Sequence, residues 1–162
     1  MLDIRVLRGG KVISENLALN DAVISNGSMA RVAELDVYAD GELITNFTGD
    51  GVIVATPTGS TAYNISAGGP IVEPEANNII ITPICSHDVG ARCIVASGKR
   101  MITTQIVRNA RRNAFLSVDG GKAIRLNMGD VTTVKKSNLE TKLVRLKDRS
   151  FFDVVNTKFK IN

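Results

Sequence analysis

The sequence predicts a mainly β protein of one domain, and three observations support this. Valine and isoleucine recur along the whole chain, and both favour strands. No long amphipathic helical pattern appears among them. The chain has 162 residues, 44% of them hydrophobic, so it can bury a sizeable core and is expected to be globular. Aromatic residues make up only 4%, which predicts a mostly aliphatic core.

The expected strands are short runs, apolar or alternating, separated by turn signals. Gly9-Gly10 and Asp40-Gly41 are two-residue hairpin signals, and Asn26-Gly27 marks another turn. Residues 78–84 are almost entirely apolar, which predicts a buried strand. In chain order the expected strands are 2–8, 11–13, 15–24 with an interruption, 30–38, 42–47, 52–55, 78–84, 94–96, 101–107, 114–118, 122–126, 131–135 and 139–146.

A second type of pattern begins near the carboxy-terminal end. Residues 151–159 have a helical period, with Ser150 as the expected cap. This period predicts that four apolar side chains share one face of the helix and that this face packs against another part of the protein. The four side chains are Phe151, Phe152, Val155 and Phe159.

The chain is organised around residues 49–70, which read GDGVIVATPTGSTAYNISAGGP. An apolar strand should end at Pro57, since proline has no N–H for a ladder. A short helix is expected over 62–65, capped by Ser60 or Thr61 and stopped by glycines 68 and 69. Backbone amides at such a helix start can hold an anionic or polar ligand, and Tyr63 offers a flat face to a nucleobase or to the core. A ligand loop and a plain structural turn both remain open.

This string resembles the signature of the NAD kinases, which phosphorylate NAD to NADP. The resemblance implies that residues 1–162 are the β-rich carboxy-terminal domain of that fold, a multi-stranded two-sheet arrangement with a short central helix and a carboxy-terminal helix. It also implies that this stretch binds NAD. The residues concerned are Asp50, Thr61, Ala62, Tyr63, Asn64 and Ser66, with Thr58 and Ser60 as secondary candidates.

Asn20 and Asp21 lie within an otherwise apolar run, where strands disfavour both residue types. They can form a bulge or turn, or their oxygens can accept hydrogen bonds from ribose hydroxyls. The sequence ALNDAVI resembles the second NAD kinase motif, in which an Asn and an acidic residue bind the ribose. Many relatives carry Glu where this chain has Asp21. Arg31, at the start of the next strand, either forms a surface salt bridge or faces the nucleotide, as the resemblance implies.

Two further positions are secondary candidates. His87, the only histidine, follows Pro-Ile-Cys-Ser, and the family often has a histidine there, near the nucleotide; a structural hydrogen bond is the other interpretation. Asp119-Gly120 resembles the third motif, usually Val-Asp-Gly-Gln, although Gly121 replaces the Gln. A hairpin turn explains this dipeptide equally well.

The family's amino-terminal domain carries a Gly-Gly-Asp-Gly motif whose Asp is taken as the catalytic base, and this string is missing here. We therefore expect the carboxy-terminal part of an NAD kinase, inactive alone, with no catalytic residue and with residues 150–162 packing against the missing domain. The resemblance implies ATP or polyphosphate as donor, a divalent metal such as Mg²⁺, and a homo-oligomer. The alternatives are a non-catalytic dinucleotide-binding or assembly module and a lipid kinase of the diacylglycerol-kinase type.

Composition argues against several other classes. The net charge of +4, from 20 basic and 16 acidic residues, is only mildly basic, so no nucleic acid is expected as a partner. Basic residues do group around Arg108 and from Lys135 to Lys160, and they are either solvated charge or a weak attraction for polyanionic nucleotides. Cys85 and Cys93 with one histidine cannot complete a four-ligand zinc site, so no metal site is expected and the thiols should be free. The first residues lack a signal peptide, and no window reaches the roughly 18 apolar residues of a membrane helix. We expect a cytoplasmic protein.

Overall fold

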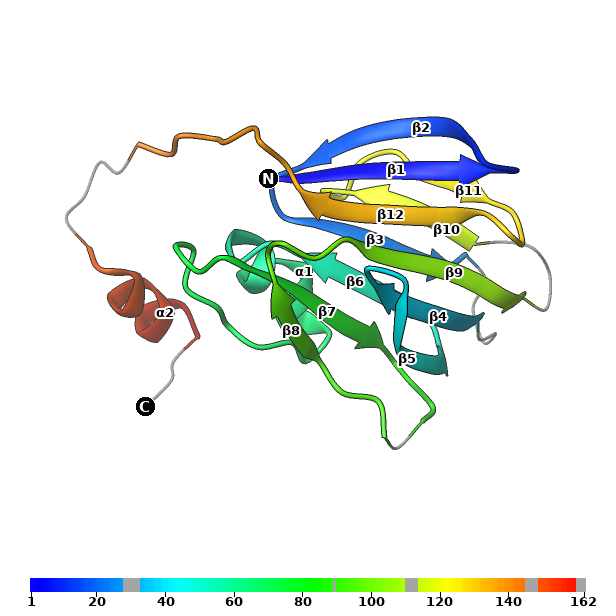
Figure 1. The fold of residues 1–162 in the computed structure, drawn as a ribbon. Coiled ribbons are helices and arrows are strands. Elements are labelled where there is room, and N and C mark those ends of the chain that lie inside the picture. The colour runs from blue at the N-terminus through cyan, green and yellow to red at the C-terminus, as the bar shows by residue number, and fades with distance from the viewer. Residues whose placement is uncertain (28–32, 89, 110–113, 145–148, 160–162) are drawn as a thin grey trace.

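The structure is a computed structural model that describes residues 1–27, 33–88, 90–109, 114–144 and 149–159. In this part of the chain, twelve strands form two six-stranded antiparallel sheets that lie in two layers (Figure 1). The predicted mainly β fold with two sheets and two α-helices is therefore confirmed. Sheet A has the order β2 (Lys11–Ala18), β1 (Leu2–Arg8), β12 (Val131–Lys136), β9 (Ile102–Asn109), β4 (Ala33–Ala39) and β5 (Glu42–Gly49). Sheet B has the order β11 (Ile124–Leu126), β10 (Ala114–Val118), β3 (Asp21–Asn26), β6 (Gly51–Ala55), β7 (Asn78–Ile84) and β8 (Ile94–Ser97).

The main hydrophobic core is built from alternate residues of the strands in both sheets. In β1, Leu2, Ile4 and Val6 are buried, while Arg5 between them is exposed. Strand β6 is buried at every position because it is covered on both faces. Val52 and Val54 belong to the main core, whereas Ile53 and Ala55 belong to a second cluster beneath Ala67 and Val72. The segment after β6 therefore covers the outer face of sheet B.

The chain changes sheets at two of the positions that the sequence singled out. Leu19 and Asn20 form a bend between β2 of sheet A and β3 of sheet B. This bend is the interruption expected within 15–24. Asp50 separates β5 of sheet A from β6 of sheet B, so Gly49-Asp50-Gly51 is the corner at which the chain changes sheets.

The glycines beside Asp50 are required by the packing of sheet B. A Cβ at Gly51 would lie 2.2 Å from the carbonyl oxygen of Ile24, and one at Gly49 would lie 2.9 Å from that of Ile84. They are needed because neighbouring backbone in sheet B passes too close for a side chain.

The central stretch forms two very short helices, the 3₁₀ helix η1 (Thr58–Thr61) and α1 (Tyr63–Ser66). Neither has a side-chain cap, so the caps expected at Ser60 and Thr61 were wrong. The Ser60 hydroxyl is instead buried against Val72, donating to its carbonyl oxygen at 3.1 Å and accepting from its N–H at 3.0 Å. The stop was predicted correctly, because Gly68 has a φ of +84°.

Two carboxy-terminal expectations need correction. Residues 139–144, within the strand expected at 139–146, are not in a sheet, and Leu143 and Val144 are exposed; residues 145–148 lie outside the described part. Helix α2 (Phe151–Phe159) is confirmed, as is its Ser150 cap, whose Oγ accepts the Asp153 N–H at 3.0 Å. However, Val155 is 7% exposed and Phe152 is 62% exposed, so the four apolar side chains do not share one face. Phe152 lies one residue, or about 100° of helix, from Phe151.

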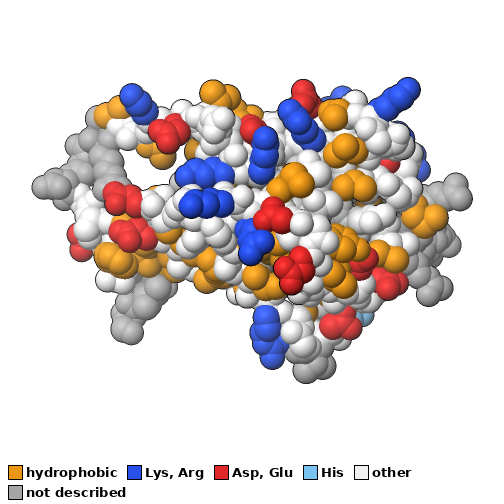
Figure 2. All heavy atoms as spheres, viewed as in Figure 1, with side chains coloured by type: hydrophobic (Ala, Val, Ile, Leu, Met, Phe, Trp, Pro, Cys, Tyr) orange, Lys and Arg blue, Asp and Glu red, His pale blue; other side chains and the backbone are white. Residues whose placement is uncertain are grey.

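The surface carries charges of both signs. On the face in Figure 2, lysine and arginine side chains are interspersed with aspartate, glutamate and hydrophobic ones. None of the helices in the described residues has the length and apolar character needed to cross a bilayer.

Candidate functional site

A cavity of about 410 Å³ lies where three separate segments meet. They are the bend between the sheets, the segment at the start of α1, and the turn after β10. Most of the predicted second and third motifs and part of the first therefore converge here. Two lining residues, Val23 and Ser117, were not predicted; each alternates with core residues along its strand, which is the signal that places it on the outer face of sheet B. The cavity is lined by Asn20, Asp21, Val23, Ala62, Tyr63, Ser117, Asp119 and Gly120.

The bend at Leu19 and Asn20 is attached on one side to the turn after β6. The Thr56 N–H donates to the Asn20 carbonyl oxygen at 2.8 Å, and its hydroxyl donates to that of Leu19 at 2.7 Å. The same hydroxyl accepts the Gly59 N–H at 2.9 Å. Thr56 was not predicted as a site residue. Its signal was a hydroxyl at the end of a buried strand, directly before Pro57.

Asp119 holds the other side of this bend. Its carboxylate accepts the N–H groups of Leu19 at 2.7 Å, Asn20 at 2.8 Å and Asp21 at 3.0 Å. The Asp119 N–H in turn donates to the Asp21 carbonyl oxygen at 3.0 Å. Asp119 and Gly120 have φ angles of +48° and +69°, as the hairpin interpretation predicts. Asp119 thus lines the cavity while both its oxygens are engaged by the backbone.

Asp21 is the most unusual group in the cavity. It is only 4% exposed, and its carboxylate has no hydrogen-bond partner among the described residues. Burial, and secondarily the nearby charge of Asp119, raise the pKa of Asp21 from 3.8 to about 6. A largely buried carboxylate that is reached only from the cavity and has no donor among the described residues is costly to ionise, so a ligand that supplies hydroxyl donors would recover free energy here.

The remaining residues of the central stretch divide by exposure. Tyr63 is 47% exposed and, with Ala62, lines the cavity. Thr61 and Ser66 belong to the same segment but do not line it. Thr58 lines a separate cavity of about 300 Å³, bordered also by Met1, Asn77 and Lys136. The segment therefore presents part of its surface to the cavity and part to the opposite side.

Asn64 lies beneath the surface rather than on it. Its side chain is fully buried, and its amide donates to the carbonyl oxygens of Ser60 at 2.9 Å and Pro70 at 3.0 Å. Its side-chain oxygen accepts the Thr82 hydroxyl at 2.6 Å. These contacts, together with the pair between Ser60 and Val72, fix α1 on sheet B. In this structure the side chains of Asn64 and Ser60 support the cavity and do not line it.

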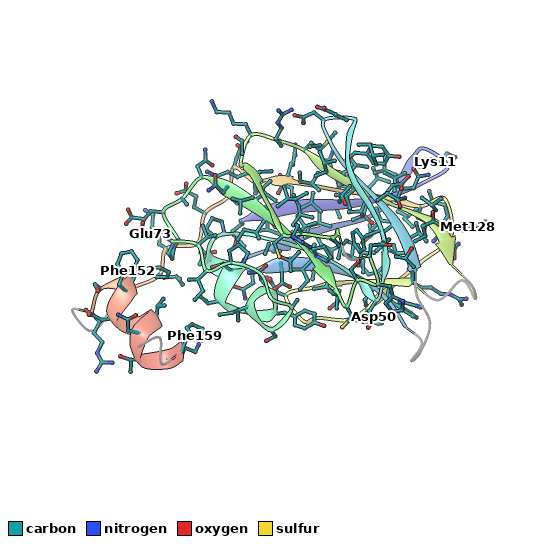
Figure 3. All side chains as sticks on the ribbon, turned by 90° about the horizontal axis from the view of Figure 1, so that it is seen from below. Lys11, Asp50, Glu73, Met128, Phe152 and Phe159 are labelled. Carbon is teal, nitrogen blue, oxygen red and sulfur yellow. The ribbon has the colours of Figure 1, made fainter. Side chains whose placement is uncertain are left out.

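Asp50 and His87 are not part of the cavity. Asp50 precedes β6, whereas Ala55 at the other end of β6 pairs with Asp21. The Asp50 N–H donates to the Ile84 carbonyl oxygen, and the His87 N–H donates to that of Thr48, each at 2.9 Å. Both side chains are exposed, and Figure 3 shows Asp50 far from α2 with its Phe152 and Phe159. Arg31, the remaining candidate, lies outside the described residues.

The described residues do not form a resident metal site. Within them, no three His, Cys, Asp or Glu side chains gather in a group that could hold an ion. Asp21 and Asp119 face one cavity, but the Asp119 carboxylate is engaged by three N–H groups. Cys85 and Cys93 are free thiols.

Comparison with known proteins identifies the family. The family model described as the ATP-NAD kinase C-terminal domain matches residues 19–146. The chain belongs to the NAD kinase family. It is 42% identical over 158 residues to the NAD kinases of Ruminiclostridium cellulolyticum and Acetivibrio thermocellus. Each match covers 98% of this chain and 55% of the relative, so the chain spans about half the length of these NAD kinases.

Solved NAD kinase structures share the fold. Yeast NADH kinase, in complex with NADH, is 36% identical, with a TM-score of 0.75 over 83% of this chain and 39% of its own. The NAD kinase of Archaeoglobus fulgidus, in complex with ATP, is 28% identical, with a TM-score of 0.70 over 85% of this chain and 51% of its own. The sequence-based assignment to this family is thus confirmed.

Proposed function

We propose that the cavity binds the ribose of NAD through Asn20 and Asp21. The observation that carries this proposal is the buried Asp21 carboxylate, which lines the cavity without a hydrogen-bond partner in the described part of the chain. Ribose offers adjacent hydroxyl donors, and a charged acceptor gives stronger hydrogen bonds than a neutral one. Asn20, beside it, can accept through its oxygen and donate through its nitrogen.

The adenine is proposed to lie against Tyr63, whose exposed ring borders the same cavity. Thr61, Ala62 and Ser66, on the same segment, are proposed to contact the nucleotide through hydroxyl or backbone groups. Asn64 and Ser60 take part by holding this segment in place. Gly120 lets the turn after β10 approach the ligand.

The whole protein is proposed to transfer the terminal phosphoryl group of ATP, or of polyphosphate, to the 2′-hydroxyl of the adenosine ribose. The 2′-oxygen attacks the terminal phosphorus, the bond to the leaving phosphate breaks, and the hydroxyl proton goes to a base outside this chain. Asn20 and Asp21 orient the hydroxyl, and positioning alone can supply much of the rate. A divalent cation would enter bound to the donor's phosphates, as Mg²⁺ commonly does.

Asp50, His87 and Arg31 are proposed as a second set of dinucleotide contacts. Since Asp50 and the cavity lie at opposite ends of β6, a ligand that meets both must extend along the strand or lie between two copies of the chain. The second arrangement agrees with the proposed homo-oligomer. Helix α2 is proposed to pack against the amino-terminal domain of the whole protein, which we place in the cytoplasm.

The binding proposal is tested by calorimetry of this chain with NAD and NADP. We expect binding that Asn20→Ala weakens about tenfold or more, the loss of a hydrogen bond with its desolvation penalty. Asn138→Ala, which changes an exposed asparagine in the segment after β12, is the control and should bind normally. Equal affinity of both variants would refute the assignment of Asn20.

The catalytic proposal requires a separate assay. The chain with NAD, ATP and magnesium should form no NADP above the blank. The same chain joined to the amino-terminal half of a curated relative should form it. If the joined protein binds NAD but stays inactive when that half is folded, a non-catalytic binding module becomes the better interpretation.

A further inference from the structure

We propose that Asp119 is a positioning residue, whose carboxylate holds the bend of Leu19, Asn20 and Asp21 so that the side chains of Asn20 and Asp21 face the cavity. The resemblance made Asp119 a secondary candidate for contact with NAD, but its hydrogen bonds point to a role exerted through the bend. Only the identity of the bound ligand rests on the proposed function. The geometry of the bend stands without it.

The two carboxylate oxygens of Asp119 accept three backbone N–H groups from the bend. Oδ2 accepts the Leu19 N–H at 2.7 Å, and Oδ1 accepts those of Asn20 at 2.8 Å and Asp21 at 3.0 Å. Three consecutive amides therefore converge on one carboxylate. A run of backbone N–H groups that points to one anion forms a concave arrangement that favours negative charge.

The bend needs such an acceptor because of where it lies in the fold. As the chain leaves β2 of sheet A for β3 of sheet B, Leu19 and Asn20 lie outside both strands. Thr56 occupies their carbonyl oxygens. Their N–H groups have Asp119 as acceptor, and buried or half-buried amides rarely stay unpaired. Two peptide groups, the one that joins Leu19 to Asn20 and the one that joins Asn20 to Asp21, are therefore held on both sides. Thr56 donates to their carbonyl oxygens, and Asp119 accepts their N–H groups.

Asp119 is well placed for this because it continues the pairing of β3 with β10. Val118, the last residue of β10, is opposite Ala22 in that ladder, so Asp119, the first residue of the turn, falls beside Asp21. The turn itself does not need the carboxylate, since Asn adopts positive φ as readily as Asp. An Asn-Gly turn would satisfy the hairpin but would replace one acceptor oxygen with an N–H₂ donor facing a backbone N–H.

The same carboxylate acts electrostatically on Asp21. Burial raises the pKa of Asp21, and the negative charge of Asp119 raises it further. Among the described residues, Asp119 is the charged group that contributes to this shift. Removal of the Asp119 charge should therefore lower this pKa. This pKa reports that the Asp119 charge lies near Asp21, whereas hydrogen exchange at residues 19–21 reports whether the carboxylate holds the bend.

The test compares Asp119→Asn with Asp40→Asn in this chain. Asp40 is a matched control because it also precedes a glycine in a hairpin, has a φ of +51°, and accepts a backbone N–H, from Met101 at 2.9 Å. It lies in the turn between β4 and β5 of sheet A, away from the cavity. Amide hydrogen exchange at residues 19–21 and the carboxyl carbon shift of Asp21 against pH are measured by NMR, without ligand.

We expect Asp119→Asn to speed exchange at residues 19–21 about tenfold or more and to lower the pKa of Asp21, whereas Asp40→Asn changes neither. NADP affinity at pH 7.5 should fall about tenfold in the first variant only. Unchanged exchange and an unchanged Asp21 titration would overturn the proposal. If Asp119→Asn fails to fold, couplings across the hydrogen bonds from the three amides to the Asp119 carboxyl carbon decide the question in the unaltered chain, and their absence overturns it.

Failure of the proposed function gives a different result. If NADP does not bind the unaltered chain, the ligand assignment is lost. The exchange and titration results still report on the bend, because they need no ligand. Loss of affinity in Asp119→Asn with unchanged exchange would show instead that Asp119 contacts the ligand directly, and would refute the positioning role.

Discussion

Gly59 and Asn20 are in such close contact that a Cβ at Gly59 would lie 2.1 Å from the carbonyl oxygen of Asn20. Gly59 belongs to the turn of the family signature, and Asn20 belongs to the proposed ribose site. The contact therefore fixes the distance between two motifs that are far apart in the sequence. Since the obstructing atoms are backbone, no side-chain rotation can relieve the clash.

Gly59→Ala should therefore destabilise the chain and disturb the cavity together. We expect a loss of about 1–3 kcal/mol in the free energy of unfolding, the usual cost of overpacking. Urea denaturation measures this loss. Gly90→Ala is the control, because its Cβ would meet no atom within 4 Å and its φ is not positive. Equal stability of the two variants would contradict the contact.

Asn64→Ala should destabilise α1 and its attachment to sheet B. The change removes three hydrogen bonds and leaves the buried Thr82 hydroxyl without its acceptor. Each buried polar group left unpaired costs about 1–3 kcal/mol, so we expect a loss of at least about 2 kcal/mol. Thermal and urea denaturation measure it, with the exposed Asn138→Ala as reference. A loss no larger than that of the reference would mean that these bonds contribute little.

The stability of the chain should depend on pH through Asp21. Its pKa is about 6 in the folded state against 3.8 ordinarily, so the folded state binds the proton more tightly than the unfolded one. The stability contribution of Asp21 is therefore lost as the pH rises from about 4 to 6. Asp21→Asn should be more stable than the unaltered chain above pH 6, by about 1–2 kcal/mol, since solvent that reaches the carboxylate from the cavity screens part of the effect.

The measurement is urea denaturation of both proteins from pH 4 to 8. Their difference should shrink toward pH 4, where both carry an uncharged group at position 21. Ligand affinity should show the opposite preference, because the ionised carboxylate is the better acceptor for ribose hydroxyls. A stability difference that is independent of pH would contradict the shifted pKa.

The substitution Asp50→Asn tests whether Asp50 contacts the ligand or only shapes the turn between β5 and β6. The Asp50 side chain is exposed and makes no hydrogen bond in the described part of the chain, so stability should change by no more than about 0.5 kcal/mol. In the chain joined to the amino-terminal half of a relative, the catalytic efficiency for NAD should fall about ten- to hundredfold if Asp50 accepts a hydrogen bond from NAD. Asp3→Asn, in sheet A, is the control. Unchanged efficiency would remove Asp50 from the proposed contacts.

Features encoded by neighbouring residues could be predicted from the sequence. The turns at Gly9-Gly10, Asp40-Gly41 and Asp119-Gly120 form as expected, because positive φ angles favour these residue types locally. The helix at 151–159 was also recognised by its own period and cap. The family assignment rested on one long string, which the comparisons confirm.

Features that depend on distant partners were not predictable in the same way. The alternating pattern of 139–146 suggested a strand, but residues 139–144 gain no neighbouring strand. The polar side chain of Asn64 gave no sign that it would be buried against Thr82, and Asp119 gave no sign that it would meet Leu19. Each of these depends on how β3, β6 and β10 come together in sheet B, which no local pattern contains.

The pairing of β1 with β12 has a consequence for how the chain is made. Leu2 is opposite Lys136 and Leu7 is opposite Val131, so the first strand finds this neighbour only when nearly the whole chain is present. Until β12 is made, β1 has β2 as its one paired neighbour in sheet A, and its other edge stays without a partner strand. Contacts between residues so far apart slow folding, because a large loop must close before they form. A ribosome that pauses before β12 would thus leave one edge of β1 open to pairing with strands of other nascent chains.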